Sequence, residues 1–80
     1  MPTIDAQTAA LVSALAAATG TQPTVDEAPQ RVRVEAEIPA DLADAEWSAL
    51  LLALRSADRF GHDRTAERAT VWAELDRRQQ

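Results

Sequence analysis

A histidine beside an aspartate is the residue pair in this sequence best suited to moving a proton. His62 and Asp63 are adjacent, and Arg59 and Arg64 flank them with positive charge. An imidazole titrates near neutral pH, so a positioned histidine can act as a general acid or base. However, no serine or cysteine nucleophile accompanies the pair at a recognisable spacing, and a single histidine with scattered carboxylates does not make a zinc site. We therefore expect a solvated loop or an interface contact, with no catalytic residue, no bound metal and no cofactor.

The second half of the chain carries the side chains that we expect at an interaction surface. Leu52 falls off the main apolar stripe of its predicted helix, and Trp72 could be either an interface anchor or one of the few bulky residues available to a core. With the charged loop described above, the predicted interaction residues are Arg59, Phe60, His62, Asp63, Arg64, Leu52 and Trp72. Gly20 and Gly61 are the only glycines, which excludes a glycine-rich phosphate-binding loop.

The composition predicts one small domain with a thin hydrophobic core. The chain has 80 residues, of which 46% are hydrophobic, and alanine accounts for about half of these. Such a core leaves little stability in reserve, so self-association or a protein partner is expected. The absence of cysteine suits a reducing cytoplasm. No long apolar run and no secretory pattern are present, so we expect a cytoplasmic protein without membrane attachment.

The charge is distributed unevenly along the chain. The formal net charge is −5. The acidic residues dominate up to residue 54, and the rest is nearly balanced and rich in arginine. An acidic balance argues against general affinity for nucleic acid, because that affinity depends on neutralising phosphates.

The N-terminal part of the chain predicts a helix followed by a linker. Residues 4–19 are rich in alanine and carry apolar residues at three- and four-residue spacing, with Thr3 and Gly20 suited to the two ends. Residues 21–30 contain two prolines and show no periodicity. We therefore divide the chain into a helix at 1–20, a linker at 21–30 and a compact domain at 31–80.

The compact domain begins with a strand and a helix. Residues 31–38 alternate between apolar and charged side chains, which predicts a half-buried strand that Pro39 ends. Residues 44–60 carry an apolar stripe that includes Trp47 and Leu50, which predicts a helix with Gly61 just beyond its end.

The last segment fits two structures. Residues 70–75 alternate like a strand, whereas residues 65–78 also carry a helical stripe. We favour the strand, which gives an α+β fold: a helix, then strand–helix–strand, with a small sheet completed by dimerisation. A helix here would instead give the order strand, helix, helix, which resembles the ribbon-helix-helix repressors and antitoxins.

Three stretches of the compact domain carry a further resemblance. They are residues 38–47, which begin Ile-Pro-Ala-Asp-Leu and end at Trp47, residues 57–63 (Ala-Asp-Arg-Phe-Gly-His-Asp) and residues 71–74 (Val-Trp-Ala-Glu). Over residues 31–76 the chain resembles small uncharacterised proteins of actinobacterial genomes and their mobile elements. This resemblance implies a lineage and a compartment, and it implies no activity.

The first functional hypothesis is a small non-enzymatic protein–protein interaction module, homodimeric, that acts as an accessory or regulatory protein. The alternative, which follows from the ribbon-helix-helix resemblance, is a DNA-binding repressor or antitoxin in which Arg31 and Arg33 contact bases. A third hypothesis is an acidic inhibitor that mimics nucleic acid, because the first two segments each carry an excess of acidic residues.

Overall fold

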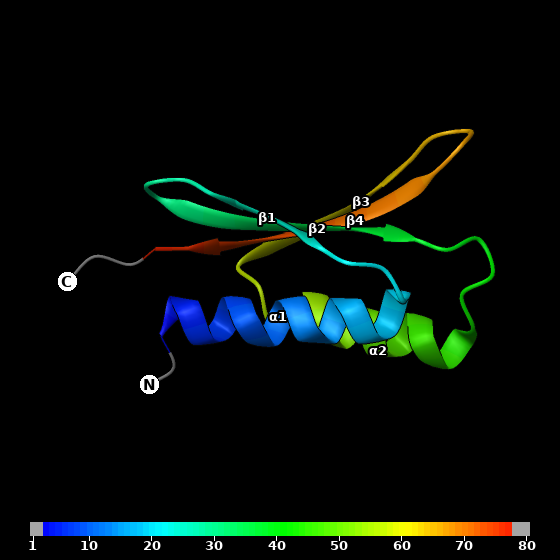
Figure 1. Cartoon of the computed structure of the whole chain (residues 1–80), viewed down its shortest axis with the longest axis horizontal. Helices are drawn as coiled ribbons and strands as arrows, with labels where there is room; N and C mark the ends of the chain where they lie inside the picture. Colours follow the sequence, from blue (N-terminus) through cyan, green and yellow to red (C-terminus); the bar gives the residue numbers. More distant parts are fainter. Residues whose placement is uncertain (1–2, 78–80) are drawn as a thin grey trace.

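The computed structural model describes residues 3–77 and shows two helices packed on one face of an antiparallel sheet (Figure 1). The sheet has four strands in the order β1-β2-β4-β3. Along the chain the elements are α1 (Ile4–Thr19), β1 (Thr24–Glu27), β2 (Arg31–Ile38), α2 (Asp44–Leu54), β3 (Arg59–Arg64) and β4 (Ala69–Asp76). The α+β class predicted from the sequence is confirmed.

Helix α1 begins and ends where the sequence predicts. Thr3 Oγ1 accepts a hydrogen bond from the Ala6 N–H at 3.1 Å, which caps the first turn. Gly20 ends the helix with φ 72°, a left-handed conformation that glycine adopts without steric cost. Leu11, Leu15 and Ala18 are buried against the sheet and α2.

The centre of the sheet confirms both predicted strands. In β2 the apolar residues Val32, Val34 and Ala36 are buried, and they alternate with charged residues. Strand β4 pairs antiparallel with β2 along its whole length, from Arg31 opposite Asp76 to Ile38 opposite Ala69. Because a strand of the same chain occupies this place, the alternative ribbon-helix-helix fold is wrong.

Three sequence-based predictions need correction. The predicted linker at 21–30 contains β1, which forms a hairpin with β2 from Thr24 opposite Glu35 to Glu27 opposite Val32. The helix predicted over 44–60 ends at Leu54, and its last predicted residues belong to β3. Gly61 therefore lies in the middle of a strand and does not cap a helix. Pairing with β4 outweighs the local helical propensity of this segment.

The two faces of the sheet differ in their cover. Leu15 and Leu54 are buried between the helices and the inward side chains of β2 and β4, and they fill the core. We call the other face of the sheet, which no helix covers, the open face (Figure 1). Within residues 3–77, neither helix has the length and apolar character needed to cross a membrane.

Candidate functional site: the β3 edge

Strand β3 brings together five of the seven predicted interaction residues. It is an edge strand, since β4 alone pairs with it. Successive side chains of a strand point to opposite faces. Phe60, His62 and Arg64 therefore lie on the helix side, and Arg59 and Asp63 lie on the open face. The fold thus separates His62 from Asp63, so their side chains do not form an acid–base pair.

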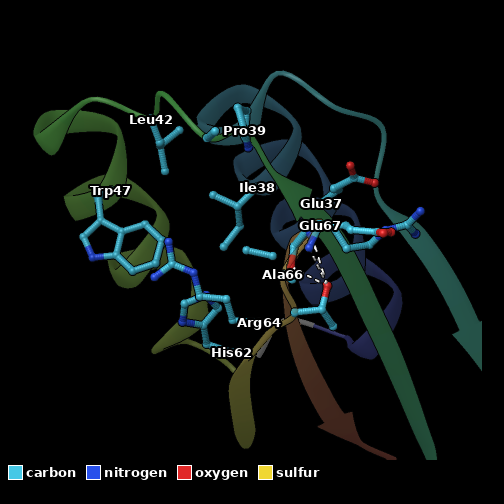
Figure 2. Close-up of a pocket in the computed structure, with 13 residues that line it drawn as sticks. Glu37, Ile38, Pro39, Leu42, Trp47, His62, Arg64, Ala66 and Glu67 are labelled. Carbon is cyan, nitrogen blue, oxygen red and sulfur yellow. Dashed lines mark hydrogen bonds between the residues drawn. The ribbon is translucent and has the colours of Figure 1, made fainter.

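On the helix side, His62 packs against Trp47 of α2. Their rings meet edge to face with centroids 5.6 Å apart and an interplanar angle of 64°, a favourable geometry for aromatic pairs. Beside this pair lies a groove of about 460 Å³, bounded by the β2–α2 loop, α2 and the β3–β4 turn. Figure 2 shows Ile38, Leu42 and Arg64 around it. His62 and Arg64 of β3 line this groove.

Apolar side chains remain exposed along this edge. Phe60 is 45% exposed although it lies on the helix side of the sheet, and Leu51, on the same side of α2 as Trp47, is 36% exposed. Leu52 is 68% exposed. At 100° per residue, Leu52 points away from the side of α2 that contains Leu50 and Leu54. The predicted interaction residue Leu52 is therefore not part of the β3 site.

The backbone of β3 presents free hydrogen-bonding groups at this edge. The Thr65 N–H donates to the Arg68 carbonyl at 2.8 Å, which sets the alternation of the antiparallel ladder. From that alternation, Arg59, Gly61 and Asp63 bond inward to β4. The N–H and C=O groups of Phe60, His62 and Arg64 consequently point out of the sheet. Such an edge is a template for pairing with another chain.

On the open face, a carboxylate at the centre of an arginine cluster holds β3 to the sheet. Glu74, whose side chain is 9% exposed, accepts hydrogen bonds from Arg59 Nε and Arg33 Nη1, both at 3.1 Å, and from Arg31 Nη1 at 3.4 Å. Arg59 also forms an ion pair with Asp76, with Nη1 3.2 Å from Oδ2. We call Glu74 with Arg31, Arg33 and Arg59 the Glu74 network. Such charge-assisted hydrogen bonds are stronger than neutral ones.

The Glu74 network changes the titration of its central carboxyl group. The hydrogen bond from Arg59 lowers the pKa of Glu74, and the hydrogen bond from Arg33 and the charge of Arg31 act in the same direction. Burial opposes this change, but it does not cancel it. Glu74 is therefore ionised at neutral pH, and its negative charge fixes the position of the three arginines.

Trp72 lies flat on β3 and does not belong to the core. It sits opposite Gly61 in the ladder, and the Arg33 guanidinium lies over its ring, 4.5 Å from the centroid. A Cβ atom at Gly61 would lie 2.5 Å from Trp72 Cε2 and 2.6 Å from Nε1. The glycine at position 61 therefore leaves the space that the indole ring fills.

We expect Gly61→Ala to lower the free energy of unfolding by about 1–3 kcal/mol, because a methyl group would displace a ring held between β3 and Arg33. Chemical denaturation measures the loss. The matched control is the same substitution in a Trp72→Ala background, where no ring blocks the methyl group and the cost should nearly vanish. An equal cost in both backgrounds would mean that the ring does not set the requirement for glycine.

The two arginines predicted to contact DNA in the alternative hypothesis lie in the Glu74 network. Arg31 and Arg33, proposed to contact bases in the alternative hypothesis, are held by Glu74 within the chain. Glu74 and Gly61 were not among the predicted interaction residues, and Trp47 was predicted as part of the apolar stripe of its helix. The alternation of residues 70–75 was a signal that Glu74 shares a face with Trp72. No pattern in the sequence indicated that arginines from other strands would contact Glu74.

Comparison of the chain with protein-family models, with curated proteins and with solved structures finds no match. The site must therefore be interpreted from its own geometry. Within residues 3–77, no group of three or more His, Asp or Glu side chains is arranged to hold a metal ion. The features of the site are an unpaired strand edge, exposed apolar side chains and a groove beside them.

Proposed function

We propose that this protein is a small non-enzymatic interaction module that binds another polypeptide chain along the β3 edge, and that it acts as an accessory or regulatory protein in the cytoplasm. The observation that carries the proposal is the unpaired edge of β3, at which Phe60 is 45% exposed. A strand added to such an edge gains main-chain hydrogen bonds, and neighbouring pockets select its side chains. The partner that we propose first is a second copy of the same chain.

Two further features support binding at β3 in preference to β1, the other edge. Strand β1 has only four residues. Short edge strands resist pairing with other chains. Strand β3 has six residues, with the groove and the Trp47–His62 pair beside it. The two edges therefore differ in length and in the apolar surface next to them.

The open face does not favour the two other functional hypotheses. Asp26, Arg33, Glu74 and Arg59 lie opposite one another across the four strands, so negative and positive side chains alternate along this row. Mimicry of nucleic acid would need a continuous acidic surface, and phosphate binding would need free arginines. Neither requirement is met by this row.

The edge can be tested with two substitutions at one residue. We expect the wild-type chain to sediment as a dimer at tens of micromolar and His62→Pro to sediment as a monomer. Proline lacks the outward N–H that would bond to the partner strand, and the substitution leaves the hydrogen bonds between β3 and β4 intact. His62→Ala is the matched control, since it removes the same ring but keeps the N–H. It should retain most of the association.

Circular dichroism of both variants checks that the sheet is intact. A monomeric wild-type chain, or a dimer that His62→Pro leaves unchanged, would contradict the proposed use of the β3 edge. Equal loss of association in both variants would show that the imidazole ring, and not the strand edge, makes the contact.

A further inference from the structure

The sequence of β3 and the residue before it is complementary to its own reverse. Residues 58–64 have the sequence Asp-Arg-Phe-Gly-His-Asp-Arg. When two copies of this segment are aligned in opposite directions, each acidic residue stands opposite an arginine, and the phenyl ring of Phe60 stands opposite the imidazole of His62. The pairs are Asp58 with Arg64, Arg59 with Asp63 and Phe60 with His62, and Gly61 lies at the centre.

The backbone limits the ways in which two copies of β3 can pair. Phe60, His62 and Arg64 carry the outward N–H and C=O groups, so the hydrogen-bonded pairs between antiparallel copies must join these residues. This leaves three registers with a two-fold axis near the middle of the strand. The axis passes through Phe60, through Gly61 or through His62.

Side-chain chemistry distinguishes these three registers. An axis at His62 puts two imidazoles opposite each other and leaves Arg59 opposite Thr65, without an ion pair. An axis at Phe60 puts Arg59 opposite Gly61. Only the axis at Gly61 puts Arg59 of each copy opposite Asp63 of the other, and opposite charges across two strands stabilise the pair.

We infer that two copies of this chain pair their β3 strands antiparallel about a two-fold axis at Gly61, forming one continuous eight-stranded sheet. This inference rests on the proposed function, since it specifies the partner and the register at the same edge. Directly paired residues share a face of the sheet. Phe60 of one copy therefore lies beside the partner copy's imidazole at position 62, on the face where His62 packs against Trp47.

The open face supports the same register. The alternating row that starts at Asp26 ends at the edge with the positive charge of Arg59. In the Gly61 register the next residue in the row is an aspartate at position 63 of the other copy, so the alternation continues across the interface. Within residues 3–77, Asp63 forms no ion pair in the single chain, which leaves its carboxylate available to Arg59 of the second copy.

Disulfide trapping tests the register, and the native chain contains no cysteine that would interfere. The full-length variants Phe60→Cys and His62→Cys are mixed in a glutathione redox buffer, and intact mass spectrometry identifies the linked species. Hydrogen-bonded antiparallel pairs have Cα atoms about 5.5 Å apart, within the range of a disulfide. We expect the mixed Phe60→Cys–His62→Cys dimer to exceed both symmetric dimers by at least about fivefold, against the statistical twofold excess of random pairing.

The other outcomes contradict the inference in distinguishable ways. Predominant linking of His62→Cys to itself would place the axis at His62, and predominant linking of Phe60→Cys to itself would place it at Phe60. Either result overturns the register while leaving the β3 edge as the binding site. A statistical mixture, or no linking at all, means that β3 does not pair with itself. The His62→Pro and His62→Ala sedimentation experiment then decides separately whether the proposed function fails.

Discussion

Glu74→Ala should lower the free energy of unfolding by about 3 kcal/mol. The substitution removes three hydrogen bonds between charged groups, and bonds of this kind contribute roughly 1.5–3 kcal/mol each. The total stays well below their sum because the arginines are 33–50% exposed, and Arg33 and Arg59 keep Glu35 and Asp76 as partners. Urea denaturation measures the change. The β3–β4 hairpin should lose the most order, since the Arg59–Glu74 contact joins its two strands.

The control for this prediction is Glu67→Ala, the same substitution in the exposed β3–β4 turn, which should change stability by no more than about 0.5 kcal/mol. The pH dependence gives a second check. Because the folded-state pKa of Glu74 is lowered, its stabilisation is present above the ordinary value of 4.5 and is lost as the pH falls through the folded-state value. The wild-type chain should therefore lose more stability below pH 4.5 than Glu74→Ala does. If wild type and Glu74→Ala lost the same stability as the pH falls, this role of Glu74 would be contradicted.

Leu15→Ala should lower the free energy of unfolding by about 3–4 kcal/mol. Leu15 is fully buried between α1 and the sheet, with 0% exposure, and removing such a side chain costs its transfer free energy and leaves a cavity. Alanine is the best helix former, so the loss reports packing and not helix propensity. In a chain this small, the variant should be largely unfolded near 37 °C. Calorimetry or thermal circular dichroism measures the change.

Leu52→Ala is the matched control, because it makes the same substitution on the other helix at a side chain that is 68% exposed. It should change stability by no more than about 0.5 kcal/mol. Similar small losses for both variants would mean that α1 is not part of the core. A large loss for Leu52→Ala alone would identify a contact surface on α2 that is separate from the β3 site.

The elements predicted correctly are those whose burial leaves a local pattern. Strand β2 was predicted with its observed bounds because one of its faces is apolar and the other is charged over eight residues. Helix α1 was predicted because its caps and its leucine spacing lie within one segment. Strand β1 could not be predicted, since all four of its residues are exposed and no alternation marks it.

Five of the predicted interaction residues lie on one strand, β3, and the contacts around them could not be predicted from the sequence. The glycine at position 61 was predicted to follow a helix end, but it lies within a strand, where the Trp72 ring fills the space that a side chain would take. Likewise, Glu74 and Arg33 are 41 residues apart in the chain, so no local pattern predicts their contact. Long-range contacts of this kind decide where β3 lies, and therefore which of its groups are free.

Hydrogen exchange at the strand edges tests the central claim, binding along β3, most directly. The amide N–H groups of Phe60, His62 and Arg64 should become more protected as the protein concentration rises, because pairing with another chain satisfies them. Val25 and Glu27 point out of the opposite edge, by the ladder alternation that the Ala28 N–H to Arg31 carbonyl bond sets, and serve as the internal reference. Their exchange should not change. If the β3 amides exchange as fast as this reference at every concentration at which the protein associates, the β3 edge is not where it binds.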